Sequence, residues 1–131
     1  MHIPSEFAIH VYEEIVKAGE KVDLVHVGLK ALGSLRMEKA YRDFGHDMDN
    51  LDTLLEVGLG FTADMEKPGG FIGKEAVLKQ KVEFKEKKGL KRRLVQVLCT
   101  DPEPQMYQAE IIRRNGVVVG DVRVGSYAHT L

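Results

Sequence analysis

The middle of the chain carries four short motifs in this order: Ser34-Leu35-Arg36-Met37-Glu38-Lys39, Gly45-His46-Asp47, Leu55-Glu56-Val57-Gly58-Leu59-Gly60-Phe61 and Phe71-Ile72-Gly73-Lys74-Glu75. Each motif alone is too short to identify a fold or a function. The order and spacing of the four motifs are more informative than any one of them. The segments around the motifs indicate on which helices, strands or loops they lie.

The segment before the motifs begins with a helical pattern. Apolar residues recur with helical spacing from Phe7 to Val16, Ser5 is a suitable N-cap, and Gly19 is a suitable stop. The apolar-rich residues 22–29 are either a strand or a loop. We therefore expect one helix followed by an extended connection.

Residues 32–44, which contain the first motif, fit neither period cleanly. Leu35 and Met37 alternate about Arg36, whereas the apolar positions from Met37 onward follow helical spacing. A strand that enters a helical turn reconciles the two patterns. In an extended segment Arg36 and Glu38 share a face, where a structural ion pair is favoured over a ligand contact.

The third and fourth motifs predict three further elements. Residues 53–57 are expected to form a short helix, and residues 58–62 a strand. Residues 73–82 place a few apolar side chains among Lys and Glu, which predicts an amphipathic surface helix. Neither residues 58–60 nor Gly69-Gly70 have the spacing of a phosphate-binding loop, so nucleotide binding is not expected.

The charged run 83–93 is the best candidate for a domain boundary, and we expect its basic residues to be solvated. Residues 94–98 have a β pattern, and Cys99 is expected to be a strand residue. Residues 109–113 and 117–124 predict a hairpin around Asn115-Gly116, a dipeptide suited to a type I′ turn.

Composition narrows the function classes. The 131 residues are 44% hydrophobic with a net charge of -1, which describes one globular domain or two small ones. There is no cationic excess for nucleic acid and no apolar run long enough for a bilayer, so neither is expected as a partner. The single cysteine, Cys99, excludes an internal disulfide and is compatible with a reducing compartment. The N-terminal residues show no secretion signal.

One acidic stretch invites a metal or acid–base interpretation. His46 is followed by Asp47, Asp49 and Asp52. Such loops are more often solvated or cap the following helix, and the stretch lacks the glycine and the terminal glutamate of a calcium loop. No metal site is predicted.

Taken together, the four motifs resemble the folate-binding aminomethyltransferase family, which includes the glycine-cleavage T-protein and the C-terminal halves of dimethylglycine and sarcosine dehydrogenases. The sequence of residues 28–36 resembles the dehydrogenase branch more than the glycine-cleavage branch. Leu32 and Gly33 stand where glycine-cleavage proteins carry an Arg-Asp pair, whose arginine contacts folate. That arginine contact is therefore not transferred to this chain.

The resemblance implies an α+β fold, with an antiparallel sheet and helices followed by part of a C-terminal β-barrel. Residues 1–87 would be the C-terminal part of the folate-binding domain, and residues 88–131 the start of the barrel. The chain would then be an interior fragment of a longer protein. Uncovered sheet edges and apolar faces would make the isolated chain self-associate or fold only marginally.

The resemblance also implies a function, namely tetrahydrofolate-dependent one-carbon transfer from a small methylated amine. FAD would belong to an N-terminal domain outside this chain. The compartment would be the bacterial cytoplasm or the mitochondrial matrix, and the protein would not be secreted.

Phe61 occupies the position where the family has an aromatic or bulky residue beside the p-aminobenzoyl part of folate. The resemblance therefore makes Phe61 the candidate for cofactor binding; the alternative is that Phe61 is a residue of the hydrophobic core. No catalytic residue is assigned, because the family's aspartate would lie upstream. The alternative function is that of a non-catalytic relative such as the regulatory subunit of pyruvate dehydrogenase phosphatase.

Overall fold

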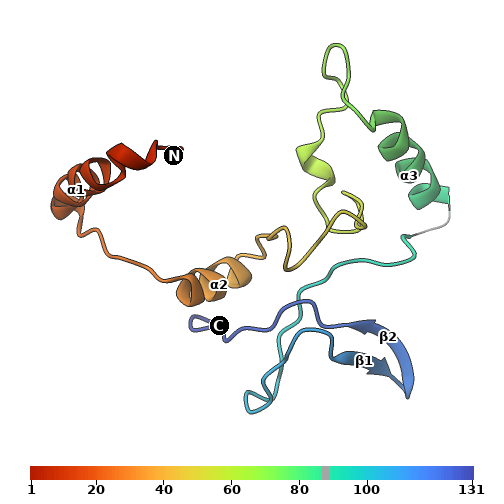
Figure 1. Ribbon diagram of the computed structural model, residues 1–131. Coiled ribbons are helices and arrows are strands. Elements are labelled where there is room, and N and C mark those ends of the chain that lie inside the picture. The colour runs from red at the N-terminus through yellow and green to blue at the C-terminus, as the bar shows by residue number, and fades with distance from the viewer. Residues whose placement is uncertain (87–88) are drawn as a thin grey trace. The chain divides into compact units, whose positions relative to one another are not determined.

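The computed structural model describes residues 1–86 and 89–131. The chain divides into two compact units, residues 1–32 and residues 33–131. Over these described residues the fold is α+β: three α-helices come first along the chain and a two-stranded antiparallel sheet follows, with long irregular connections between them (Figure 1). Among the described residues, none of the helices has the length and apolar character needed to cross a membrane.

The first unit contains the predicted N-terminal helix. A 3-10 turn, η1 (Ser5–Phe7), leads into α1 (Ala8–Gly19), and a second 3-10 turn, η2 (Glu20–Val22), follows. The helix is confirmed. The predicted cap is wrong, because Ser5 lies inside η1 and neither η1 nor α1 has a side-chain hydrogen bond at its N-cap.

Gly19 is the last residue of α1, as expected. Its close approach to Leu24 is a second reason for glycine at this position, and the sequence pattern does not show it. The N–H of Leu24 donates to the carbonyl of Gly19 at 3.0 Å. A Cβ at position 19 would lie 2.5 Å from the Leu24 side chain, so only glycine fits there. Asp23, with φ of 52°, is the left-handed residue that ends η2. The Tyr12 hydroxyl in α1 and Nε2 of His26, three residues after Asp23, form a hydrogen bond of 2.8 Å.

The first motif is helical, which corrects the expected strand at Leu35 and Met37. Helix α2 spans Leu29–Glu38, and the N–H of Leu32 donates to Gly28 at 3.0 Å in its first turn. Most of its residues, such as Leu, Lys, Ala, Arg, Met and Glu, are strong helix formers. Their summed preference prevails over a two-residue alternation that neighbouring strands would have had to support.

Helix α2 ends in a Schellman motif with an unusual residue. The N–H of Ala40 donates to Met37 at 2.9 Å, and the N–H of Tyr41 donates to Arg36 at 2.9 Å. This pattern places Ala40 in the left-handed region, with φ of 56°. Glycine is the usual residue there, because a Cβ is disfavoured in that conformation.

Residues 53–62 contain no strand, contrary to expectation. Residues 54–58 form a hydrogen-bonded turn rather than a full helix, and the 3-10 turn η3 (Gly60–Thr62) follows. Gly58 has φ of 74°, which is incompatible with an extended segment. At Gly60 a Cβ would approach the Leu55 side chain to 2.8 Å. The two glycines therefore serve a tight turn.

Helix α3 (Lys74–Glu86) confirms the predicted surface helix, and it extends into the charged run. The domain boundary predicted between residues 87 and 88 lies outside the described residues, so the two-domain division stays a prediction. Residues 94–98 are not part of a described strand, and Cys99 is exposed outside any strand. The β pattern of residues 94–98 has no ladder partner in the described part of the chain.

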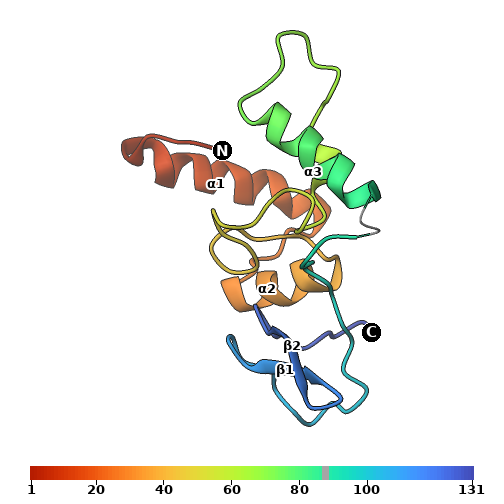
Figure 2. The ribbon, with the colours of Figure 1, turned by 90° about the vertical axis from the view of Figure 1, so that its right-hand side faces the viewer.

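The predicted hairpin is confirmed. Strand β1 (Ile111–Arg114) pairs antiparallel with β2 (Val117–Asp121), as Figure 2 shows. Asn115 and Gly116 have φ of 51° and 81°, the two positive values that a type I′ turn requires. An irregularity lies between Ile112 and Arg113.

Apolar burial is small. Among the described residues, Val57 is the buried hydrophobic side chain, at 3% exposure. All but one residue of β1 and β2 are exposed, so both faces of the hairpin meet solvent. A two-stranded sheet in this state is marginal by itself.

Replacing Ala40 by Gly is expected to raise the free energy of unfolding by about 0.5 to 1 kcal/mol, because it relieves the left-handed strain. The measurement is urea unfolding followed by circular dichroism. The matched control is Ala31→Gly in the exposed first half of α2, which should lower stability by a similar amount. If both substitutions changed the free energy of unfolding in the same direction, the left-handed conformation of Ala40 would be contradicted.

The isolated 131-residue chain is expected to self-associate through its uncovered strands. Light scattering after size-exclusion chromatography should show a mass that rises with concentration. Val119→Lys, on exposed β2, should shift the distribution toward monomer. A monodisperse monomer at every concentration would refute this expectation.

Candidate functional site

Arg36 of the first motif organises the loop that carries the second motif. Its guanidinium donates to the Tyr41 carbonyl at 3.2 Å, contacts the Asp47 carboxylate, and lies 3.7 Å from Asp43. Asp47 also accepts the N–H of Asp43 at 2.8 Å. The preference for a structural ion pair at Arg36 is confirmed, although its partners lie in this loop and not at Glu38.

Glu38 binds the C-terminal segment of the same unit. Its carboxylate accepts the N–H of Thr130 at 3.1 Å and also the Thr130 hydroxyl. The hydrogen bond from the hydroxyl is the main reason that the pKa of Glu38 lies below its ordinary value, and it outweighs a smaller effect of burial in the opposite direction. The Glu38 carboxylate is therefore occupied by a structural contact.

His46 has a local partner. Its Nδ1 lies 2.9 Å from the Asp43 carboxylate, and the side chain is largely exposed. Within the described residues, no group of three or more His, Cys, Asp or Glu side chains is arranged to hold a metal ion. The acidic residues of the following loop have other contacts, described below.

The third motif forms a turn that presents Phe61. Thr53 and Glu56 make a capping box: the N–H of Thr53 donates to Glu56 Oε2 at 3.0 Å, and the N–H of Glu56 lies 3.4 Å from the Thr53 hydroxyl. Gly58 and Leu59 then donate to Leu55 and Leu54 at 3.2 and 2.8 Å. We call residues 53–59 the capped turn.

Phe61, the candidate folate-binding residue, lies on η3 directly after the capped turn. Its side chain is 84% exposed, so the core alternative does not describe it in this structure. An exposed aromatic face is available to stack against a planar ligand. Its role in binding stays a prediction.

An open groove of about 520 Å³ lies between the capped turn and α3. Its lining includes Thr53, Leu54, Val77 and Gln80. The Gln80 amide donates to the Thr53 hydroxyl at 2.7 Å, which ties α3 to the start of the turn.

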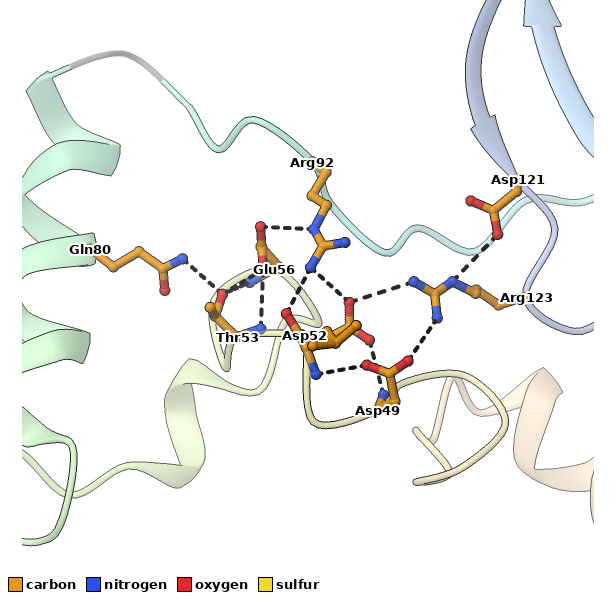
Figure 3. Close-up of polar contacts among 9 residues, drawn as sticks. Asp49, Asp52, Thr53, Glu56, Gln80, Arg92, Asp121 and Arg123 are labelled. Atoms are coloured by element: carbon orange, nitrogen blue, oxygen red, sulfur yellow. Dashed lines mark hydrogen bonds and ion pairs between the residues drawn. The ribbon is translucent and has the colours of Figure 1, made fainter. Parts of the chain in front are cut away.

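Arg92 is the central cation of a polar network around the capped turn (Figure 3). Its guanidinium lies 3.1 Å from Glu56 and 3.3 Å from Asp52, and it donates to the Leu51 carbonyl at 2.8 Å. The expectation that this basic run is simply solvated is therefore wrong at Arg92. The acidic residues between 49 and 56 indicate that a basic partner could exist. Because about forty residues separate them from Arg92, a local sequence pattern does not identify which basic residue pairs with them.

Arg123, just after β2, reaches the same acidic residues. It lies 3.6 Å from Asp52, 3.9 Å from Asp49 and 3.5 Å from Asp121. Asp52 also accepts the N–H of Asp49 at 2.9 Å, and its side chain is only 8% exposed. The acidic loop was expected to be solvated or to cap the following helix; it instead forms hydrogen bonds within itself and binds two arginines from distant parts of the chain.

The network sets the ionisation of Glu56. Burial raises the pKa of Glu56, but the hydrogen bonds from Arg92 and Thr53 outweigh it, so the pKa of Glu56 lies below its ordinary value of 4.5. The same hydrogen bond with Glu56 raises the pKa of Arg92. The pair is therefore ionised at neutral pH.

The GCVT N-terminal domain matches residues 1–67, about half of the 131 residues. This chain belongs to the GCVT family. The matched range of this GCVT-family chain includes Arg36, the capped turn and Phe61. It ends before α3, so the matched range does not include Arg92 or Arg123.

The relatives that align with all of the chain include three different kinds of protein. Human mitochondrial sarcosine dehydrogenase is 38% identical, and the chain spans 14% of its length. The mitochondrial pyruvate dehydrogenase phosphatase regulatory subunit of Mus musculus is 35% identical, with 15% of its length covered. An aminomethyltransferase from Thermoanaerobacter sp. (strain X514) is 34% identical, with 34% covered. The GCVT-family chain therefore spans a small part of these relatives.

Replacing Glu56 by Gln should flatten the acid dependence of stability. Because the folded-state pKa is depressed, the stabilisation from ionised Glu56 is complete above its ordinary pKa of 4.5 and is lost as the pH falls from there through the folded-state value. Urea unfolding at pH 6 and at pH 3.5 should show a smaller difference in the variant than in the parent chain. An unchanged difference would refute the role of the Glu56–Arg92 pair.

Proposed function

We propose that the chain is part of a tetrahydrofolate-dependent one-carbon transfer module in a protein like dimethylglycine or sarcosine dehydrogenase. The observation that carries the proposal is the GCVT family match over residues 1–67, which includes the four-residue stretch 58–61 that ends in the exposed Phe61. The sarcosine dehydrogenase and aminomethyltransferase relatives support the same class of chemistry.

In this proposal Phe61 supplies a flat apolar face for the p-aminobenzoyl part of folate. Tetrahydrofolate, when bound, supplies the nitrogen that accepts the aminomethyl carbon and yields methylenetetrahydrofolate. The residues of this chain bind and orient the folate, which lowers the barrier by positioning. The hydrogen bonds that close the capped turn define the backbone path that leads to Phe61.

The remaining parts of the proposal concern the full-length gene product. Residues 88–131 would begin a C-terminal β-barrel, with β1 and β2 among its strands. FAD would be bound in an N-terminal domain that oxidises the small methylated amine. A bacterial cytoplasm or a mitochondrial matrix is the proposed compartment, the latter supported by the mitochondrial relatives.

A regulatory role is the second candidate. The observation in its favour is the 35% identity to the pyruvate dehydrogenase phosphatase regulatory subunit over the whole chain. A relative that acts by binding a protein partner would have no need of folate. Folate binding therefore separates the two candidates.

Phe61→Ala in the full-length gene product should weaken tetrahydrofolate binding about tenfold, because the stacking face is removed. Phe61→Tyr should keep most of the affinity. The measurement is isothermal titration calorimetry with tetrahydrofolate under anaerobic conditions.

The matched control is Phe84→Ala on α3, which should bind as the parent protein does. Equal losses for the two alanine variants would remove Phe61 from the site. A parent protein that binds no tetrahydrofolate at millimolar concentration would overturn the proposed function and favour the regulatory role.

A further inference from the structure

Residues 92–94 are one of three described segments that form hydrogen bonds to the capped turn from outside. The other contacts come from the Gln80 amide, which donates to the Thr53 hydroxyl at 2.7 Å, and from Arg42 Nε, which donates to the Val57 carbonyl at 3.1 Å. Arg92 contacts the Glu56 carboxylate at 3.1 Å and the Leu51 carbonyl at 2.8 Å. Two residues later, the N–H of Leu94 donates to the backbone carbonyl of Glu56 at 2.8 Å. Side-chain and backbone contacts thus converge on Glu56 from the same segment.

Glu56 is closely coupled to the position of Phe61. It forms the capping box with Thr53, and the hydrogen bond from Leu59 to Leu54 closes the turn around it at 2.8 Å. The 3-10 turn then begins at Gly60, and Thr62 donates to Leu59 at 2.9 Å. Hydrogen-bonded turns follow one another from Thr53 to Thr62, so we expect a tilt of the capped turn to move the backbone that carries the Phe61 ring.

We propose that Arg92 is a positioning residue for the Phe61 site. It holds the capped turn so that the ring is presented to the ligand, without itself touching the ligand. This inference rests on the proposed function and deepens it, because it assigns part of the folate affinity to a residue outside the range matched by the family.

The geometry requires an arginine. One guanidinium reaches three acceptors, namely the carboxylates of Glu56 and Asp52 and the carbonyl of Leu51. A planar guanidinium with five donors can serve several acceptors in fixed directions, whereas a lysine ammonium acts as a compact point charge. Arg92→Lys should therefore only partly preserve the arrangement.

The test compares tetrahydrofolate affinity of the full-length gene product by calorimetry in Arg92→Met, Arg92→Lys and Arg93→Met. Arg93 is the matched control, because it is the neighbouring exposed arginine and has no hydrogen bond or ion pair to another described residue. Arg92→Met is expected to weaken binding about fivefold, the effect of one solvent-exposed ion pair, and Arg92→Lys by less. Arg93→Met should bind as the parent does.

A double-variant cycle with Phe61→Ala separates positioning from general damage. If Arg92 acts through Phe61, Arg92→Met should have little further effect once the ring is gone. An Arg92→Met effect of equal size in the Phe61→Ala background would overturn the inference, as would unchanged affinity in both Arg92 variants. If Arg92→Met does not fold, Arg92→Lys takes its place in the same cycle.

The outcomes distinguish this inference from the proposed function. A parent protein that binds no tetrahydrofolate overturns both. Binding by the parent, a loss in Phe61→Ala and no loss in the Arg92 variants overturns the positioning role alone.

Discussion

The pairing of two arginines with one acidic loop is the interaction on which the unit 33–131 depends. Arg92 and Arg123 approach Asp52 from different parts of the chain, and Asp49 and Glu56 complete the set of carboxylates. Apolar burial does not take this role, since Val57 is the buried apolar side chain among the described residues. Ion pairs thus link segments distant in sequence in a unit with little fully buried apolar surface among its described residues.

This arrangement explains why some elements were predictable and others were not. The hairpin depends on Asn115-Gly116, whose positive φ values are a local requirement of the turn, and α1 shows helical periodicity. Helix α3 is indicated by a few apolar residues among Lys and Glu. The first motif is helical where its alternating pattern predicts a strand, because the helix-forming composition of α2 outweighs a two-residue alternation. The strand expected at residues 58–62 failed at Gly58, whose left-handed conformation closes a turn.

Some residues of the candidate site are likewise predictable from the sequence and others are not. Phe61 was found through resemblance to the family, and the structure places it on an exposed 3-10 turn. Arg92 and Arg123 were not found, because their partners lie far away along the chain and a run of basic residues is usually solvated. The sequence predicts a structural role for Arg36, but its partners lie in the loop after α2, whose conformation the sequence pattern does not specify.

The scarcity of buried apolar surface around Val57 has a thermodynamic consequence. The heat-capacity increment of unfolding scales with the apolar area that becomes hydrated, so it should be small per residue for this polypeptide. Its stability curve against temperature is accordingly shallow, without the pronounced maximum of a well-packed domain. Added electrolyte, which screens exposed charges within about 10 Å at 0.1 M, would perturb it more than moderate cooling does.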